Sequence, residues 1–273
     1  TGDQGAQRSI TIDDKTVEVN SMRTGPYSWT PEVHPVYNPP MPMQAVGFDI
    51  DGTLYPASAL YLRMLPASLG HLRLLRAFSR VRHELRELNP TLEWHHGNPP
   101  DLERFHRFQA ELTAKHLGWT ADHAYKVIEE FFYDKSAACF DRIPLFPHVV
   151  ETLTLLRAAG LKLGALSDFP CERKLKLMEL HTRFDTALTS EETGLVKPDR
   201  ASFDLLAKRL GVRNDQLLYV GNSEAYDVTG ARAAGMQTAL ITRSAKARAG
   251  TKADFVFHDF RDLGRYVLKH AQD

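Results

Sequence analysis

The chain has 273 residues, of which 34 are lysine or arginine and 34 are aspartate or glutamate, so its formal net charge is zero. This balance excludes a strong overall field, and we therefore expect neither nucleic acid nor a membrane as a partner. The two cysteines, Cys139 and Cys171, are too few for a disulfide framework, which favours a reducing, cytoplasmic location. No stretch approaches the roughly 18 apolar residues of a membrane span.

The first 43 residues differ from the rest of the chain. They begin with a polar segment, contain one possible short strand at residues 16–19, and then carry prolines at positions 26, 31, 35, 39, 40 and 42. Proline at this density favours extended, unpaired backbone. We therefore predict that residues 1–43 form an N-terminal arm or linker.

From residue 44 onward, short apolar runs alternate with stretches of helical spacing. The apolar runs predict strands at residues 44–50, 161–168, 184–190, 217–222, 237–242 and 254–259. The helix-like stretches at residues 147–160, 198–211 and 225–235 each end in a glycine, as helices commonly do. Strands that alternate with helices of this length predict an α/β fold with a parallel sheet.

More than ninety residues separate the first predicted strand from the next, and they show hardly any strand signal. Helical spacing predicts helices at residues 61–88, 101–118 and 120–140, the last with Thr120 as its N-cap. We therefore predict a helical insertion at residues 55–145, called the insertion below. The α/β core is then divided between residues 44–54 and residues 146–273.

The predicted helix at residues 61–88 is strongly basic. It carries arginines at positions 63, 73, 76, 80, 82 and 86 against two glutamates. A basic amphipathic helix can bind anionic lipid or nucleic acid. It is also typical of an insertion helix whose arginines are solvated or face an anionic substrate, and we favour this second interpretation.

Polar side chains follow four of the predicted strands, at the edge where a parallel sheet binds its ligands. They are Asp49 and Asp51 after the first strand, Ser167 and Asp168 after the second, Lys197 after the third, and Asn222, Ser223, Glu224 and Asp227 after the fourth. Carboxylates with a hard divalent cation, together with a hydroxyl and a lysine, suit a phosphate dianion. Gly52 lets the backbone after Asp51 turn sharply, so that its amide can face the same point.

With these residues in this order, the chain resembles the haloacid dehalogenase-like hydrolases. The segments FDIDGTLY (48–55), LSD (166–168), GLVKPD (194–199) and VGNSEAYDVTGARAAGM (220–236) are similar to the four motifs of that family. The resemblance covers residues 44–259. It implies a doubly wound, Rossmann-like core with an inserted helical cap domain of type 1, which closes over the substrate.

The resemblance also implies a role for each matching residue. Asp49 would be the nucleophile that forms an aspartyl-phosphate, and Asp51 the general acid and then the general base. Ser167 and Lys197 would hold the phosphoryl oxygens, with Gly52 and Asp168 as further phosphate-binding positions. Each of these residues stands at a strand end that the sequence itself predicts to be at the binding edge.

Magnesium is the cofactor that the resemblance implies. It would bind the Asp49 carboxylate, the Asp51 main-chain carbonyl and a group from the fourth motif, for which Asn222 and Asp227 are the candidates. The family usually has aspartate where this chain has Asn222, which removes one negative charge. We therefore expect weaker Mg²⁺ binding, unless Glu224 or Asp227 moves in to compensate.

The acid at position 51 separates the branches of the family. Dehalogenase members carry a non-acid there, whereas an acid favours a phosphatase or a phosphotransferase. We expect Mg²⁺-dependent hydrolysis of a small phosphorylated metabolite, such as a sugar phosphate, phosphoglycolate or a nucleotide. Two alternatives remain open: a phosphotransferase or mutase in which a sugar hydroxyl replaces water, and a binding or regulatory member that kept the fold.

Overall fold

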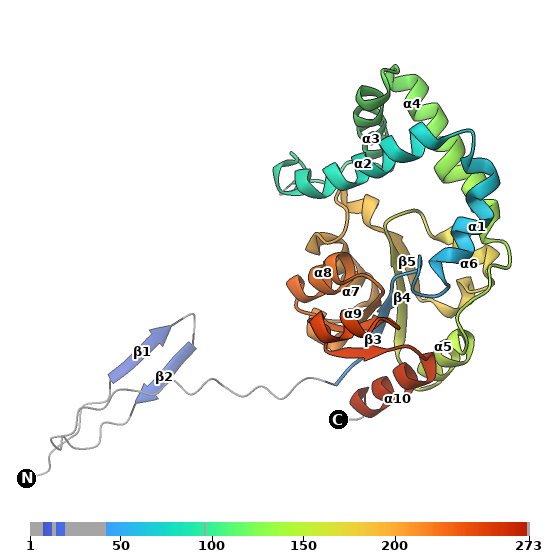
Figure 1. Cartoon of the computed structure of the whole chain (residues 1–273). Coiled ribbons are helices and arrows are strands. Elements are labelled where there is room, and N and C mark those ends of the chain that lie inside the picture. The colour runs from blue at the N-terminus through green and yellow to red at the C-terminus, as the bar shows by residue number, and fades with distance from the viewer. Residues whose placement is uncertain (1–7, 13–14, 20–41, 96, 272–273) are drawn as a thin grey trace, which may run out of the picture. The chain divides into compact units, whose positions relative to one another are not determined.

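A computed structural model describes residues 8–12, 15–19, 42–95 and 97–271 (Figure 1). The chain divides into two compact units, residues 1–39 and residues 40–273. In the first unit, β1 (Arg8–Ile12) and β2 (Lys15–Val19) form an antiparallel hairpin. The strand predicted at residues 16–19 is therefore confirmed, whereas its partner β1 was not predicted. The prolines between positions 26 and 40 lie outside the described residues.

The second unit is built on a six-stranded parallel sheet in the order β5-β4-β3-β6-β7-β8. Its strands are β3 (Ala45–Phe48), β4 (Lys162–Ser167), β5 (Thr186–Thr189), β6 (Leu217–Gly221), β7 (Gln237–Ile241) and β8 (Phe255–Phe257). All six predicted strands are confirmed, each shorter than its apolar run. The chain runs outward from β3 to β5 and returns at β6 on the other side of β3. Ligands of such sheets bind where the strand order reverses, which here is beyond β3.

Successive residues of each strand face opposite helical layers. Val46 and Phe48 of β3 belong to the core that includes α5 (Val149–Ala158) and α10 (Phe260–Ala271). Ala45 belongs to the core that includes α7 (Arg200–Leu210) and α8 (Thr229–Ala233). Figure 1 shows α5 and α10 together on one side of the sheet and α7 and α8 on the other. The doubly wound fold is therefore confirmed.

Gly47 sets how closely α7 approaches the centre of the sheet. A Cβ atom at this position would lie 2.7 Å from Leu206 Cδ2 and 3.1 Å from Tyr219 Cδ2. Real Cβ atoms do not approach carbon that closely, so only glycine fits between β3 and α7. The glycine just before the first motif is therefore explained by packing.

The remaining short elements of the core connect strands to helices. They are α6 (Glu172–Leu177), α9 (Ala245–Gly250), the 3₁₀ turns His181–Arg183, Ser190–Thr193 and Asn214–Gln216, and the π-helical turn Glu224–Val228. Of the helices predicted in the core, α5 and α7 are confirmed, and α8 begins later than predicted, after the π-helical turn. No helix in the described part of the chain is both long enough and apolar enough to cross a membrane.

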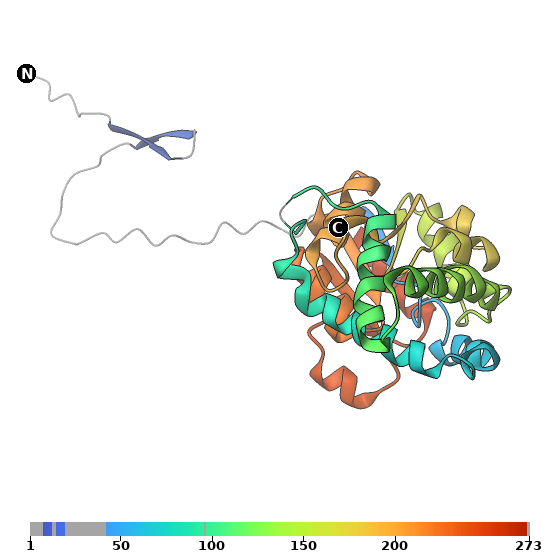
Figure 2. The ribbon, with the colours of Figure 1, turned by 90° about the horizontal axis from the view of Figure 1, so that it is seen from above.

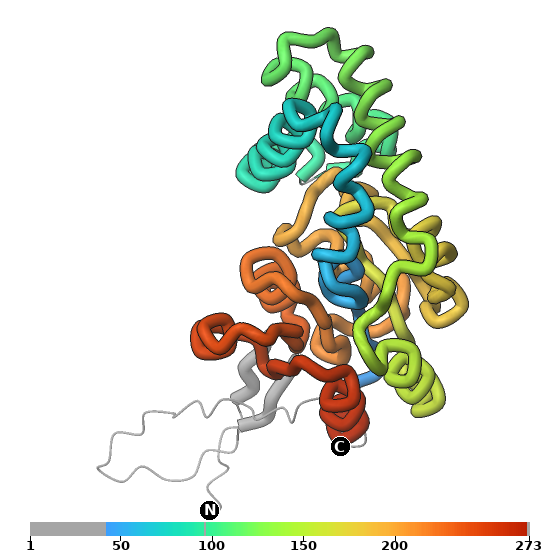
Figure 3. Tube along the Cα trace, turned by 45° about the vertical axis from the view of Figure 1, so that its right-hand side comes forward, coloured from blue at the N-terminus to red at the C-terminus, as the bar shows by residue number. Residues whose placement is uncertain are grey.

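Between β3 and β4 the chain forms the predicted helical insertion. Its elements are α1 (Ala57–Ser68), α2 (Leu72–Leu88), α3 (Leu102–Leu117), α4 (Ala121–Ile128), the 3₁₀ turns Asn89–Thr91 and Lys135–Phe140, and the π-helical turn Glu129–Asp134. Figures 1 and 3 show these helices stacked on the side of the sheet to which β3 leads, and Figure 2 shows them from above. The insertion therefore stands over the binding edge.

Two of the predicted insertion helices differ in extent from the observed ones. The stretch at residues 61–88 is broken between α1 and α2 at residues 69–71, where Gly70 carries the low helix propensity of glycine. The helix predicted at residues 120–140 is α-helical only to Ile128 and then changes to π and 3₁₀ turns. Its predicted N-cap is confirmed, because the Thr120 hydroxyl accepts a hydrogen bond from the His123 amide.

A buried ionic network joins the insertion to the core. Arg82 of α2 donates to Glu191 Oε1 at 2.7 Å and to the main-chain carbonyl of Asp168 at 2.7 Å. His106 of α3 lies 3.0 Å from Glu191 Oε2 and 2.8 Å from Glu129 Oε1. The Tyr133 hydroxyl also donates to Glu191 Oε1, at 2.9 Å. Glu191 has no exposed surface, so both of its oxygens depend on groups from the insertion.

This network corrects the interpretation of the basic helix. Arg73, Arg76 and Arg80 are exposed as expected, but Arg82 is only 5% exposed and is bound to groups of the core rather than solvated. Arg86 is half-buried and donates to Asp168 Oδ2 at 2.8 Å and to the carbonyl of Lys197 at 3.0 Å. The acceptors lie on the core, far away in the sequence, and helical spacing alone does not reveal them.

We predict that His106 makes the stability of this unit depend on pH. Burial lowers the pKa of His106, but hydrogen bonds to Glu129 and Glu191 outweigh this effect and raise it from 6.5 to about 9. A raised pKa in the folded state adds stability that is complete below the unfolded value and is lost as pH rises through the folded value. We expect the free energy of unfolding to fall by up to about 3 kcal/mol from pH 6.5 to above pH 9 through this group.

Urea unfolding over this pH range tests the prediction. In His106→Gln, the free energy of unfolding should no longer fall with pH through this group. His123→Gln, at an exposed position of α4, should keep the wild-type dependence of the free energy of unfolding on pH. Equal slopes for wild type and His106→Gln would contradict it.

Candidate active site

Asp49 directly follows β3 and lies at the centre of the candidate site. The Asp49 amide donates to the carbonyl of Val220 at 2.9 Å, which extends the pairing with β6 and fixes the backbone. The Thr53 hydroxyl, from the turn that follows, donates to Asp49 Oδ2 at 2.8 Å. This hydrogen bond holds one carboxylate oxygen of Asp49. Asp49 is only 5% exposed, so its other oxygen is also shielded from solvent.

One lysine ammonium lies between two buried carboxylates. Lys197 Nζ is 2.7 Å from Asp49 Oδ1 and 2.7 Å from Asp227 Oδ1, and it is 3.3 Å from the Tyr219 hydroxyl. Burial lowers the pKa of Lys197, but the charges of Asp227 and Asp49 outweigh it and hold the pKa well above its ordinary value. Lys197 is therefore a permanent cation at this edge of the sheet.

The negative charge around Asp49 exceeds what this lysine offsets. Burial, together with the carboxylates of Asp227 and Asp51, raises the pKa of Asp49 to about 7 against the lowering effect of Lys197. Each unpaired charge in a buried site is costly, so an additional cation beside Asp49 would be favourable.

Asp51 has a separate set of partners. Its Oδ1 accepts from the Tyr55 hydroxyl at 2.5 Å, and its Oδ2 accepts from Lys174 Nζ at 2.7 Å and from Ser167 Oγ at 3.0 Å. Burial alone would raise the pKa of Asp51, but the charge of Lys174 and the hydrogen bonds from Lys174, Tyr55 and Ser167 lower it. The carboxylate of Asp51 is therefore stabilised in its ionised form.

Lys174 is a site residue that the sequence analysis missed. It lies on α6 and is 8% exposed, although lysine is rarely buried without a partner. A sequence signal for it exists: Cys171, Lys174, Leu175 and Met178 follow helical spacing, and all four are buried. A lysine within an apolar helical stripe indicates a buried anion opposite, which here is Asp51.

The fourth strand end brings Asn222 against the turn of the first. Asn222 Nδ2 donates to the main-chain carbonyl of Asp51 at 3.4 Å. Gly52 has φ +89°, and a Cβ atom there would lie 2.1 Å from Asn222 Nδ2, so glycine is required by both the backbone conformation and the close approach. The predicted sharp turn at Gly52 is confirmed.

The other acids of this segment have different partners. Asp227 is 2% exposed, and its Oδ2 accepts from the amides of Asn222 at 3.1 Å and Ser223 at 3.0 Å. Glu224 is bound elsewhere, to the Thr251 hydroxyl at 2.5 Å and the Lys252 amide at 2.9 Å. Glu224 is therefore not positioned to compensate for Asn222, and Asp227 is the remaining candidate.

The residues that gather here fit a magnesium ion by the chemistry of their donors. The carboxylates of Asp49 and Asp227, the carbonyl of Asp51 and the side chain of Asn222 offer hard oxygen atoms, and Mg²⁺ commonly binds a few such ligands and retains waters. The excess negative charge around Asp49 also suits a cation. Within the described residues, no group of three or more His, Cys, Asp or Glu side chains could hold a metal by itself.

The carboxylate of Asp168, a predicted phosphate-binding position, binds groups of the protein. Its Oδ1 accepts from the Ser190 hydroxyl at 2.7 Å and from the Lys197 amide at 3.2 Å, and its Oδ2 accepts from Arg86 at 2.8 Å. Burial would raise the pKa of Asp168, but Lys197, Arg82 and Arg86 lower it. An ionised carboxylate repels a phosphate dianion, and this one instead positions the backbone of Lys197.

Comparison with known proteins matches this arrangement to one family and several relatives. The model of the haloacid dehalogenase-like hydrolase family matches residues 43–235. The protein named glyceraldehyde 3-phosphate phosphatase of Methanopyrus kandleri is 31% identical over 247 residues, which span 85% of this chain and 100% of that protein. The protein named phosphoglycolate phosphatase of Salmonella typhimurium is 29% identical, over 81% of this chain and 91% of its own length.

Solved structures share the fold. A HAD phosphatase from Thermococcus onnurineus gives a TM-score of 0.55 at 24% identity, over 85% of this chain and 100% of that chain. The L-2-haloacid dehalogenase from Xanthobacter autotrophicus gives 0.58 at 23% identity, over 82% of this chain and 98% of that chain. At these identities the comparison establishes the architecture alone.

We predict that Lys174 keeps the pKa of Asp51 low. Lys174→Met removes the charge and the hydrogen bond that oppose burial, so the pKa of Asp51 should rise. Carboxyl-carbon NMR titration of aspartate-labelled protein measures it directly. Lys176→Met, at an exposed position of the same helix, is the matched control and should leave the Asp51 titration unchanged. An unshifted titration in Lys174→Met would refute the prediction.

Proposed function

Because the chain belongs to the haloacid dehalogenase-like hydrolases, we propose that it is a Mg²⁺-dependent phosphatase of a small phosphomonoester that works through an aspartyl-phosphate on Asp49. One observation carries the proposal: two aspartates beyond β3 each bind a separate lysine, Asp49 with Lys197 and Asp51 with Lys174, both at 2.7 Å. The acid at position 51 is the residue that a phosphatase of this family needs for its leaving group. The similarity to two relatives named as phosphatases supports the same branch.

In the first half of the reaction, an oxygen of Asp49 attacks phosphorus and the bond from phosphorus to the alcohol oxygen breaks. The bonding electron pair leaves with the alcohol oxygen, which takes a proton from Asp51. In the second half, Asp51 accepts a proton from water as the water attacks phosphorus and releases Asp49. Lys174 favours the ionised form of Asp51, which is the form that this second half requires. Asp51 must therefore carry a proton when the first half begins, and the proton that it takes from water in the second half restores this form.

Two residues would hold the phosphoryl oxygens. Lys197 lies beside Asp49, so its ammonium can offset charge as it spreads over those oxygens. Ser167 Oγ accepts from the amide of Phe169 at 3.2 Å while it donates to Asp51. This leaves the hydroxyl proton free to turn from Asp51 to a phosphoryl oxygen.

Magnesium would be held by Asp49, the Asp51 carbonyl and Asn222 or Asp227. When bound, such an ion polarises the phosphoryl group and neutralises its charge. The protein's own residues orient the nucleophile through Thr53 and keep the charge of Lys197 at the same point.

The insertion, residues 55–145, would act as the cap over this site. Arg86 of α2 binds both the carboxylate of Asp168 and the carbonyl of Lys197, so the insertion is connected directly to the backbone of Lys197. A cap of this kind excludes water from the first half of the reaction.

We predict that Asp49→Asn abolishes Mg²⁺-dependent phosphate release, by about a thousandfold or more, because an amide is a poor nucleophile toward phosphorus. Release of inorganic phosphate from an aryl phosphate, with and without Mg²⁺, measures it. Asp134→Asn, at a largely exposed acid of the insertion, should keep wild-type activity. Wild-type protein that releases no phosphate from a broad panel of monoesters would favour the binding or regulatory alternative.

A separate prediction concerns the departure at position 222. Asn222→Asp should bind Mg²⁺ more tightly than wild type, because it restores a carboxylate beside the Asp51 carbonyl, where Asn222 Nδ2 now donates at 3.4 Å. Isothermal titration with Mg²⁺ measures the affinity without any need for turnover. Unchanged affinity would show that Asn222 is not a ligand position.

A further inference from the structure

Asp51 and Lys174 border a cavity of about 280 Å³ between the insertion and the core. Its walls come from α1, from the turns that follow α4 and from the loop after β4. Four of the larger side chains on these walls are apolar: Met64, Phe132, Phe140 and Phe169. The cavity therefore has a charged end at the candidate general acid and an apolar body beyond it.

Three of the polar groups on these walls are already bound within the protein, whereas Tyr61, also on the wall, is 70% exposed. The Tyr133 hydroxyl donates to Glu191 at 2.9 Å, and the Ser136 hydroxyl donates to the carbonyl of Phe132 at 2.5 Å. Lys174 donates to Asp51. A ligand in the cavity body would therefore meet mainly carbon, with Arg173 as an exposed cation at its border.

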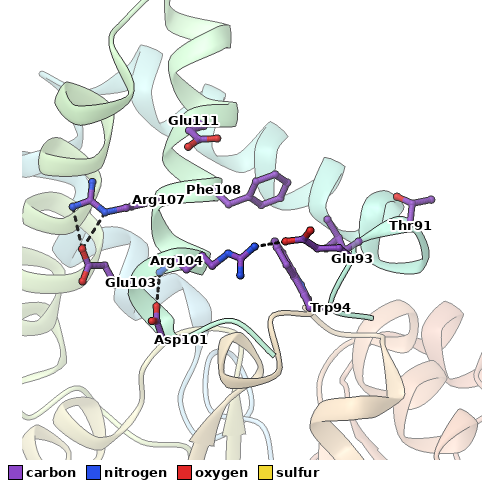
Figure 4. A pocket seen from close by; sticks show the side chains of 10 residues that line it. Thr91, Glu93, Trp94, Asp101, Glu103, Arg104, Arg107, Phe108 and Glu111 are labelled. Atoms are coloured by element: carbon purple, nitrogen blue, oxygen red, sulfur yellow. Dashed lines mark hydrogen bonds and ion pairs between the residues drawn. The ribbon is translucent and has the colours of Figure 1, made fainter. Parts of the chain in front are cut away.

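Two other cavities differ from this one in different ways. One of about 560 Å³ lies against α3 and the segment before it, and Figure 4 shows four of its charged side chains in two pairs: Arg104 with Glu93, and Arg107 with Glu103. It contains no residue of the candidate active site. A third, of about 830 Å³, shares Met64, Phe132 and Phe169 with the cavity at Asp51 and continues its apolar surface.

We propose that the cavity at Asp51 binds the alcohol part of the substrate, and that this alcohol is apolar, with an aromatic ring or a body of similar size on a short chain. The inference rests on the proposed phosphatase function and names its substrate class. A buried cavity of about 150 Å³ holds one benzene ring, so 280 Å³ accepts a ring with a short chain. Aromatic walls favour such a body through edge and offset contacts.

The same walls disfavour a sugar or another polyhydroxylated alcohol. Each hydroxyl buried without a partner costs about 1–3 kcal/mol, and the wall hydroxyls of Tyr133 and Ser136 are already donors to protein oxygens. The sugar phosphates and nucleotides expected from the sequence are therefore poorer substrates in this proposal.

Steady-state kinetics with two matched esters test the proposal. Phenylpropyl phosphate and glycerol phosphate are both esters of primary alcohols, so that their leaving groups differ little in acidity. We expect kcat/KM to be at least about tenfold higher for phenylpropyl phosphate, with the difference in KM. Equal values, or a preference for glycerol phosphate, would overturn the substrate class and leave the phosphatase function intact.

A variant on the cavity wall tests whether the cavity causes the preference for phenylpropyl phosphate. Met64→Gln keeps the length of the side chain and adds polar atoms to the wall, and it should reduce the preference for phenylpropyl phosphate about tenfold. Leu62→Gln is the matched control, because Leu62 is on the same helix, is 71% exposed and lines neither of the two apolar cavities. The control should keep the preference, and an equal loss in both variants would contradict a role for the cavity.

Binding of phosphonates separates failure of this proposal from failure of the proposed function. Phenylpropylphosphonate and dihydroxybutylphosphonate carry no ester bond, so calorimetry with Mg²⁺ measures their binding without turnover. Tighter binding of the phenylpropyl compound supports the apolar cavity even if no ester is hydrolysed. A lack of hydrolysis counts only against the phosphatase function. Equal or weaker binding overturns the apolar cavity even if esters are hydrolysed.

Discussion

The ammonium of Lys197 is the group on which the rest of the site depends. It is buried with two carboxylates, Asp49 and Asp227, at 2.7 Å from each, and its charge offsets theirs where water cannot. Its own place is set from outside the sheet, because the Asp168 carboxylate accepts its amide hydrogen and Arg86 donates to its carbonyl. The position of the lysine therefore depends on the insertion as well as on the core.

This dependence makes the insertion part of the site's electrostatics. Glu191 of the core has Arg82, His106 and Tyr133 as its partners, and all three come from the insertion. Removing one partner of a buried charge typically costs about 3–5 kcal/mol, so these contacts hold α2 and α3 firmly against the core. By contrast, α1 buries none of its residues, whereas α2 buries six. The helix that supplies one wall of the cavity thus contributes no buried side chain.

The amino-acid sequence was sufficient to predict the sheet and the residues at its binding edge. Each strand is a short apolar run, and parallel strands bring their carboxyl ends together, so Asp49, Ser167, Lys197 and Asp227 could be grouped from their positions along the chain. The break at Gly70 was harder to predict, since helical spacing continues on both sides of it.

The pairing of charges could not be predicted in the same way. Lys174 and Asp51 are 123 residues apart, and Arg82 and Glu191 are 109 residues apart. No local pattern says which acid a buried cation will meet, because that depends on how the insertion lies over the sheet. Asp168 shows the same limit: its position beside Ser167 does not reveal that its carboxylate binds Arg86 and Ser190.

Chemistry and substrate selection are carried by different segments of the chain, but they meet at Lys174. The motif residues come from the strand ends, whereas the apolar walls come mostly from the insertion. Two of the wall residues also contact Lys174. Its ammonium is 5.0 Å from the Phe140 ring and 5.4 Å from the Phe169 ring. A cation held over aromatic faces is stabilised by them. These rings therefore shape the cavity and also help to hold the group that keeps Asp51 ionised, so a change in either ring would alter selection and proton transfer together.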